Sequence, residues 1–272
     1  MPSNTPAAEP VQRPVIFVGG APRSGTTVTH ALLCSSDKAN KYCPEISFVR
    51  PLFNAYAVGI QNWRNHTNAF FKSPQAFKLH MRNQVLRSLH HIGLQTSKTP
   101  GTQPAVLVVK DPLLTPMFYW VHQLMGPHAK FVTVVRDPFN VTRSRQEVIE
   151  KMGRAFTGQD AHNTAAEYMQ SYAHLEVPEL QPSVFAFRYE DLTNPDVTAR
   201  IADFTGLPDI AADKVWNEGR EVKDAADANP WFSPKYHQPI NTESRFEPLA
   251  EEFRGPVREV CAKLIDRFGY NG

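Results

Sequence analysis

The segment from residue 20 to residue 27, GAPRSGTT, holds the residue types best suited to binding a phosphate group. Its two glycines have the spacing of a Walker A loop, but Thr26 stands where that loop has its lysine. Glycines let the backbone approach a phosphate, and successive N–H groups at a helix start then bind it. The alternative is an ordinary glycine turn that caps a helix. The candidate phosphate ligands are Arg23, Ser24, Gly25, Thr26 and Thr27, of which Arg23 carries the positive charge.

The missing lysine argues against a nucleoside triphosphatase. Such enzymes place this lysine on the β- and γ-phosphates and hold Mg²⁺ with a separate acid. No apolar run of this chain ends in the acidic pair that would hold the magnesium, and no HExxH, CxxC or aspartate cluster is present. The loop is therefore suited to a shorter phosphate group, and we expect no metal.

A second candidate anion site follows the apolar run KFVTVV. Arg136 ends this run, Pro138 suits the first turn of a helix, and Ser144 comes eight residues after Arg136. Ser144 would lie on the second turn of that helix, so that Arg136 and Ser144 could bind one phosphate together. The alternative is a capped, charged helix start without a ligand.

Four short apolar runs predict the strands that must position these loops, at residues 15–20, 105–110, 130–136 and 184–189. The stretches between and after them predict helices. One of these ends at about residue 63, and the others span residues 26–35, 74–92, 115–125, 139–152, 161–176, 196–205 and 251–268. This alternation predicts an α/β fold, a P-loop-type three-layer α/β/α arrangement with a central parallel sheet.

Each predicted strand is followed by a distinctive polar group, in the order GAPRSGTT, KDP, RDP and RYEDL. Ligands of such folds bind beyond the carboxyl ends of the strands. We therefore expect the four polar groups to form one site.

The motifs PRSGTT and, about 110 residues later, VVRDPFNVTRSR resemble the sulfotransferases that use 3′-phosphoadenosine 5′-phosphosulfate (PAPS). IFVGGAPRSGTT, CPE, KDP and YEDL, in this order, are most similar to the tyrosylprotein sulfotransferase branch and its bacterial relatives. The resemblance covers roughly residues 15–205. It implies that the first loop binds the 5′-phosphosulfate and that Arg136 and Ser144 bind the 3′-phosphate. It also implies in-line transfer of a sulfuryl group to a hydroxyl, without a metal, leaving adenosine 3′,5′-bisphosphate (PAP).

Lys110 and Arg23 are the expected catalytic cations. Arg23 is placed to serve the phosphosulfate, and in the similar tyrosylprotein enzymes the lysine of KDP bridges to the sulfonate and the leaving oxygen. For Lys110 the alternative is a salt bridge with Asp111 or with another acid.

Glu45 is the expected general base, because a carboxylate near a bound hydroxyl can take its proton. The family has Cys-Gly-Glu-Glu here and uses the second acid, whereas this chain has Ile46 at that position, so the assignment shifts by one residue. One alternative is that Glu45 caps a helix starting near Ser47. His30 is a rival base, since other sulfotransferase branches use histidine.

Two further residues are assigned to the nucleotide through the resemblance. The tyrosine of RYEDL lies near the adenosine in the family, which points to Tyr189; the alternative is a core tyrosine. Residues 239–245, PINTESR, resemble a late loop that closes over the nucleotide, and Arg245 is a candidate 3′-phosphate contact.

Composition narrows the class of protein. The chain has 272 residues, 42% of them hydrophobic, and 29 basic against 27 acidic residues, a balance that gives no broad field for coating nucleic acid. Its three scattered cysteines favour a reducing compartment, and we expect a cytoplasmic protein. No stretch is apolar for long enough to span a membrane, and no secretory signal is visible. Residues 1–13 are predicted to be a disordered lead-in and residues 14–272 a single sulfotransferase domain.

The acceptor stays open at this level: a hydroxyl of a small molecule, lipid, glycan or peptide. The aromatic-rich stretches 48–71 and 156–172 are expected to shape its pocket. Two other functions remain as alternatives, a P-loop small-molecule kinase that uses ATP and a non-catalytic nucleotide-binding protein. The oligomeric state is open, and a homodimer is among the options.

Overall fold

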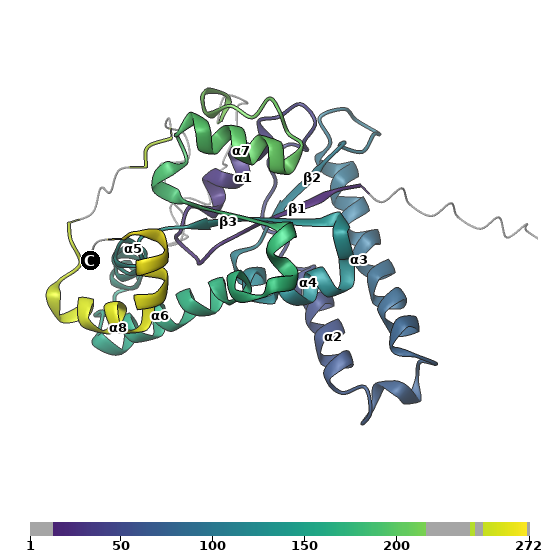
Figure 1. Ribbon diagram of the computed structural model, residues 1–272, viewed down its shortest axis with the longest axis horizontal. Coiled ribbons are helices and arrows are strands. Elements are labelled where there is room, and N and C mark those ends of the chain that lie inside the picture. The colour runs from purple at the N-terminus through teal and green to yellow at the C-terminus, as the bar shows by residue number, and fades with distance from the viewer. Residues whose placement is uncertain (1–12, 216–239, 243–246, 271–272) are drawn as a thin grey trace, which may run out of the picture.

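The computed structural model describes residues 13–215, 240–242 and 247–270. A four-stranded parallel sheet in the order β2-β1-β3-β4 lies at its centre (Figure 1). The strands are β1 (Val15–Gly19), β2 (Leu107–Lys110), β3 (Ala129–Val135) and β4 (Val184–Arg188). All four predicted strands are present, and the prediction of a parallel sheet is confirmed.

Strands β1, β2 and β3 are almost entirely buried, which explains why their sequences are continuously apolar, whereas β4 at the edge of the sheet is mostly half-buried. Phe17 of β1 packs with Val109 and Phe131 in one core, and its neighbours Ile16 and Val18 pack in another core on the opposite face. Since side chains of a strand alternate between faces, these short runs serve two cores at once.

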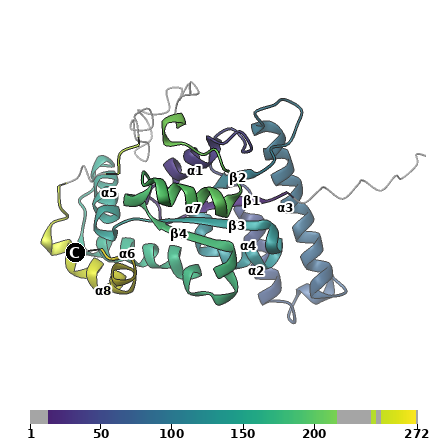
Figure 2. The same ribbon diagram turned by 45° about the horizontal axis from the view of Figure 1, so that its top comes forward.

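Helices cover both faces of the sheet (Figures 1 and 2). On one face lie α1 (Thr26–Cys34) and α7 (Pro195–Thr205). The other face carries α2 (Arg50–Gln61), α3 (Pro74–Thr96) and α4 (Phe118–Met125). A third core joins α5 (Pro138–Lys151), α6 (Gly158–Tyr172) and α8 (Glu251–Phe268). The three-layer α/β/α prediction is therefore confirmed.

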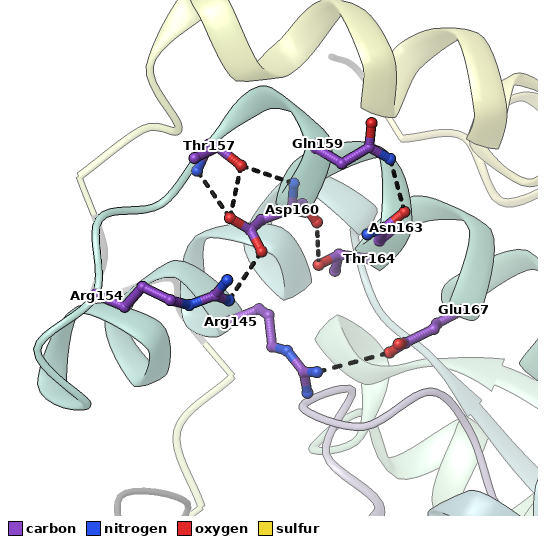
Figure 3. A network of polar contacts seen from close by, with 8 residues as sticks. All are labelled: Arg145, Arg154, Thr157, Gln159, Asp160, Asn163, Thr164 and Glu167. Atoms are coloured by element: carbon purple, nitrogen blue, oxygen red, sulfur yellow. Dashed lines mark hydrogen bonds and ion pairs between the residues drawn. The ribbon is translucent and has the colours of Figure 1, made fainter.

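Several helix boundaries differ from the sequence prediction for local reasons. Pro116 lies in a 3-10 helix, Pro112–Met117, so that α4 begins only at Phe118 instead of at residue 115. Helix α6 begins three residues before the predicted start, because Thr157 and Asp160 form a reciprocal capping box (Figure 3). It also ends at Tyr172, where a short 3-10 helix replaces it.

Three predictions fall on residues that the structure does not describe. The lead-in predicted for residues 1–13 lies outside the described residues except for Arg13, whose guanidinium donates to the carbonyl of Pro104 at 2.7 Å. Most of residues 239–245, which resemble a loop that closes over the nucleotide, lies outside as well, and so does Arg245. No helix of the described ranges is long and apolar enough to cross a membrane.

Candidate active site

The predicted phosphate-binding loop runs from the end of β1 to the start of α1. Gly25 is the N-cap residue of α1, with φ 101° in the left-handed region, and it offers no side chain to cap the helix. The first N–H groups of a helix have no carbonyl partner within the helix. Arg23 has φ 74°, a conformation that residues other than glycine rarely adopt, and such strained positions cluster at functional sites. The loop therefore presents free helix N–H groups beside a constrained arginine.

The two predicted phosphate-binding segments touch each other. Arg23 Nε donates a hydrogen bond to Ser144 Oγ at 3.0 Å, although 121 residues separate them. Arg136 Nη1 donates to the carbonyl of Arg23 at 3.3 Å. A single ligand lying over this contact would therefore meet both segments.

Tyr189 lies against the loop. The guanidinium of Arg136 stacks over its ring at 4.7 Å from the centroid, and its hydroxyl donates to the carbonyl of Asn241 at 3.2 Å. A Cβ atom on Gly25 would come within 2.6 Å of the ring edge. Tyr189 is half-buried, so it borders the loop and is not a fully buried core residue.

Lys110 joins the loop to the predicted base. Its side chain is buried, and Nζ donates to Glu45 Oε1 at 2.8 Å and to Thr27 Oγ1 at 3.0 Å. The Glu45 side chain is 47% exposed, which leaves this carboxylate open to a ligand. The N–H of Ile46 donates to the carbonyl of Lys110 at 3.0 Å, so the two segments are also joined through their backbones.

Asp111 is not the partner of Lys110. It is buried, its Oδ2 lies 3.6 Å from Arg50 Nη1, and its Oδ1 accepts the N–H of Leu113. Burial raises the pKa of Asp111, and the nearby Arg50 charge partly opposes the rise. The geometry gives Asp111 a structural role at the start of the 3-10 helix.

The geometry supports neither a helix-capping role for Glu45 nor His30 as the base. Helix α2 begins at Arg50 with Val49 as its N-cap residue, and no side chain caps it, so Glu45 is not a helix cap. His30 is fully buried, and its Nε2 lies 3.2 Å from the carbonyl of Val108 in β2. That placement turns the imidazole toward the sheet. Ile46 is buried in the core, which explains why this position carries no acid.

Two of the predicted loop residues turn inward. Ser24 and Thr26 are buried, at 0% and 4% exposure, so their side chains belong to the packing of the loop. Contact of these two residues with a phosphate would therefore come first through the backbone. Ser144 of the second segment is also buried, at 2% exposure, where its Oγ accepts from Arg23 Nε, so a ligand reaches this hydroxyl only by displacing that contact.

Sequence reasoning missed the hydroxyl groups that hold the loop and the end of β3. Thr115 Oγ1 accepts the N–H of Gly20 at 3.1 Å, and Tyr172 accepts the N–H of Ala21 at 3.1 Å. Three tyrosines also donate to three successive carbonyls at the end of β3: Tyr172 to Val134, Tyr270 to Val135 and Tyr168 to Arg136. Burial raises the pKa of all three phenols, so they remain hydrogen-bond donors at neutral pH.

One sequence signal for this set exists. Tyr168 and Tyr172 stand four residues apart in a predicted helix, which places them on one face. Their target carbonyls could not be read from this spacing.

Among the described residues, no group of three or more His, Cys, Asp or Glu side chains could hold a metal ion.

The parallel sheet, with the strand-loop-helix turn between β1 and α1, defines an α/β protein of the P-loop type. The profile of the sulfotransferase family matches residues 14–211, most of the chain, and the chain belongs to this family. The sulfotransferase prediction is confirmed. A comparison with curated protein sequences gave no match.

Three solved structures share the fold at low sequence identity. The sulfotransferase domain of the Synechococcus PCC 7002 olefin synthase matches with a TM-score of 0.59 and 17% identity, over 96% of each chain. The sulfotransferase domain from the curacin biosynthetic pathway gives 0.52 and 16%, over 93% of this chain and 97% of that one. A sulfotransferase from Mycobacterium avium gives 0.53 and 15%, over 97% of this chain and 78% of that one.

Proposed function

We propose that this chain transfers a sulfuryl group from PAPS to a hydroxyl acceptor by in-line displacement. The observation that carries this proposal is the contact between Arg23 and Ser144, since it unites the loop expected to bind the 5′-phosphosulfate with the pair expected to bind the 3′-phosphate. Two anion sites this close suit a nucleotide with phosphate groups on both sides of one ribose. The kinase alternative is not favoured, because Thr26 replaces the Walker lysine and is buried.

The residues present fit the donor. The uncapped N-terminus of α1 and the Arg23 guanidinium would hold the 5′-phosphosulfate, with Gly25 leaving room for close approach of the backbone. Arg136 and Ser144 would hold the 3′-phosphate through charge-assisted hydrogen bonds. Tyr189, beside Gly25 and under Arg136, would border the adenosine portion. Arg245 remains a proposed contact outside the described residues.

Lys110 and Glu45 would carry the chemistry. Glu45 would take the proton of the acceptor hydroxyl while the new S–O bond forms and the bond to the leaving phosphate oxygen breaks. Lys110 would exchange its contact with Glu45 for the leaving oxygen and neutralise the charge that develops there, together with Arg23. No metal is needed for these roles.

The acceptor would bind on the exposed side of Glu45. Phe48 and Leu113, 62% and 56% exposed, follow Glu45 and Lys110 by three residues each. The backbone bond between Ile46 and Lys110 holds these two short segments together. Their apolar side chains would contact the part of the acceptor that carries the hydroxyl.

Calorimetry tests the donor assignment. We expect PAP to bind without metal and to bind more tightly than ATP with Mg²⁺. Stronger binding of ATP with Mg²⁺ would transfer support to the kinase alternative. A PAPS-dependent screen of phenols, sterols, sugars and tyrosine peptides would then identify the acceptor class, and binding of PAP without transfer to any acceptor would favour a non-catalytic nucleotide-binding protein.

We further propose that residues 14–272 form one domain, because α8 packs with α5 and α6 in a shared core. A cytoplasmic location is proposed from the three cysteines, Cys34, Cys43 and Cys261, which are buried and form no disulfide.

A further inference from the structure

Charge is distributed very unevenly along this chain. The 64 residues from 46 to 109 contain no Asp or Glu, although they contain seven of the 29 Lys and Arg residues. The remaining chain therefore has 22 basic against 27 acidic residues, so the small net charge of +2 combines a strongly basic segment with an acidic remainder. The seven cations are Arg50, Arg64, Lys72, Lys78, Arg82, Arg87 and Lys98.

Helices α2 and α3 of this segment form a hairpin that projects from the body of the protein (Figure 1). The inner face of α3 is buried through Phe77, Met81, Val85 and Leu89, as its sequence periodicity predicts. The outer face of α3 carries polar and basic side chains together with apolar ones, and one of the apolar ones, Leu79, is 54% exposed. The turn at residues 62–73 lies at the far end of the hairpin from the sheet.

The turn is held in a fixed shape. Phe71 packs on Phe77 with ring centroids 4.9 Å apart, and Thr67 Oγ1 donates to the carbonyl of Gly59 at 2.8 Å. Ser73 caps α3 by accepting the N–H of Ala76 at 3.1 Å. Phe70, between these anchors, is nonetheless 82% exposed. The fold therefore presents a large apolar side chain to solvent at a protruding tip.

We propose that the turn at 62–73 and the outer face of α3 form a docking surface for an anionic lipid membrane. Arg64 and Lys72 are exposed on either side of Phe70 in the sequence, and no acid of the hairpin neutralises them. Basic side chains beside an exposed aromatic residue are the combination that binds anionic headgroups and inserts into the lipid interface. The hairpin would thus hold the protein at a membrane surface without spanning it.

A lipid surface fits this geometry better than an acidic protein does. A protein partner would have to provide a concave pocket for the convex tip, whereas a fluid interface accepts an inserting side chain without a matching shape. A soluble polyanion would use the cations but leave Phe70 and Leu79 in water. The inference does not depend on the proposed reaction, because it concerns a separate part of the chain.

Vesicle flotation with the full chain tests the proposal, using phosphatidylcholine vesicles with and without phosphatidylserine at low and high salt. We expect binding only to the anionic vesicles, and weaker binding at high salt. Replacing Arg64 and Lys72 by Gln should weaken binding about five-fold per cation. Phe70→Ser, which keeps the charge, should weaken it about ten-fold. Circular dichroism would verify that each variant is folded.

Matched controls lie elsewhere on the surface. Lys151→Gln with Lys214→Gln removes the same charge, and Met152→Ser removes an apolar side chain that is 61% exposed. Both controls should bind like the unchanged protein. Equal binding to neutral and anionic vesicles, no binding, or an unaffected Phe70→Ser variant would overturn the proposal. Tight binding to heparin without vesicle binding would overturn it in favour of a soluble polyanion.

Discussion

The ammonium group of Lys110 lies 2.8 Å from the carboxylate of Glu45, and the same ammonium contacts Thr27 of the phosphate-binding loop at 3.0 Å. In this arrangement the proposed catalytic cation, Lys110, and the proposed base, Glu45, are paired with each other. The proposed reaction needs Lys110 at the leaving oxygen and Glu45 at the acceptor hydroxyl, so their contact must open. Because Thr27 belongs to the loop, an anion bound at the loop would compete with Glu45 for the Lys110 ammonium. We therefore expect the donor to bind before the acceptor is activated.

Glu45→Gln should lower kcat by roughly 10²-fold or more, because an amide cannot take the acceptor proton. PAP affinity should hold or rise, since Glu45 does not touch the nucleotide and its neutralisation frees Lys110 for the 5′-phosphate. Turnover with PAPS and PAP calorimetry measure the two effects, and Glu252→Gln, an exposed acid on α8, serves as the control. Unchanged turnover in Glu45→Gln would remove this residue from the chemistry and reopen the search for the base.

Arg136→Ala and Ser144→Ala should each weaken PAP binding by about 10-fold to 10²-fold, the usual cost of a lost hydrogen bond to a charged group. Arg145→Ala is a close control, because its guanidinium points to Glu167 at 3.8 Å (Figure 3). Loss of this partly exposed pair should change PAP affinity by no more than about two-fold. Titration calorimetry with PAP measures all three variants. An equal loss in Arg136→Ala and Arg145→Ala would show only that local positive charge matters and would sink the 3′-phosphate assignment.

Gly25→Ala should abolish tight PAP binding. The new methyl group would meet the Tyr189 ring, and φ 101° is unfavourable for alanine, a strain of about 1–3 kcal/mol. Gly158→Ala is the matched control, since no atom lies within 4 Å of the new methyl group and the residue is helical. Thermal unfolding and PAP titration would separate lost stability from lost binding. A Gly25→Ala variant with normal affinity would contradict the proposed close approach of the phosphosulfate.

Tyr172→Phe should reduce both stability and PAP affinity. Its hydroxyl accepts from Ala21 and donates to Val134, so its loss leaves two buried backbone groups unpaired, at about 1–3 kcal/mol each. Tyr270→Phe removes the contacts of this hydroxyl with the Val135 carbonyl and with Glu190 Oε2, without touching the loop. We expect it to lower stability while PAP affinity holds. Parallel urea unfolding and PAP titration distinguish the two variants, and identical affinities would show that Tyr172 does not position the loop.

The strands could be predicted from the sequence, and both candidate anion-binding segments could be located, because their signals are local. A run such as VIFVG is apolar on both faces, and the glycines of GAPRSGTT follow it directly. The contact of Arg23 with Ser144 was expected only in outline, through the rule that parallel strands end at one edge.

Other features depend on partners that the chain brings together from a distance. Thr115 reaches Gly20 across 95 residues, and Tyr270 reaches Val135 across 135 residues. A hydroxyl group can pair with any exposed carbonyl, so residue type alone does not name its partner. The basic hairpin was also hidden, since a net charge averages over segments of opposite sign.

His174 is a buried histidine that should make stability depend on pH. It is 3% exposed, and its Nε2 lies 2.9 Å from Thr133 Oγ1 in β3. Burial lowers the pKa of His174 to about 4, below the value of about 6.5 in an unfolded chain. Buried Asp111 has a raised pKa, so its protonation has the opposite effect on stability as the pH falls.

The unfolded chain protonates His174 below about pH 6.5, whereas the folded protein protonates it only near pH 4. The stability that this residue contributes is therefore complete above about pH 6.5 and is lost as the pH falls from there to about 4. The total loss is on the order of 3 kcal/mol. Urea unfolding measured from pH 7 downward should therefore show a falling free energy of unfolding. His174→Gln should flatten this dependence, and comparing it with the unchanged protein cancels the contribution of Asp111. His66→Gln, at an exposed site, should leave the dependence intact. If His174→Gln followed the same pH curve as the unchanged protein, His174 would not be the group that titrates.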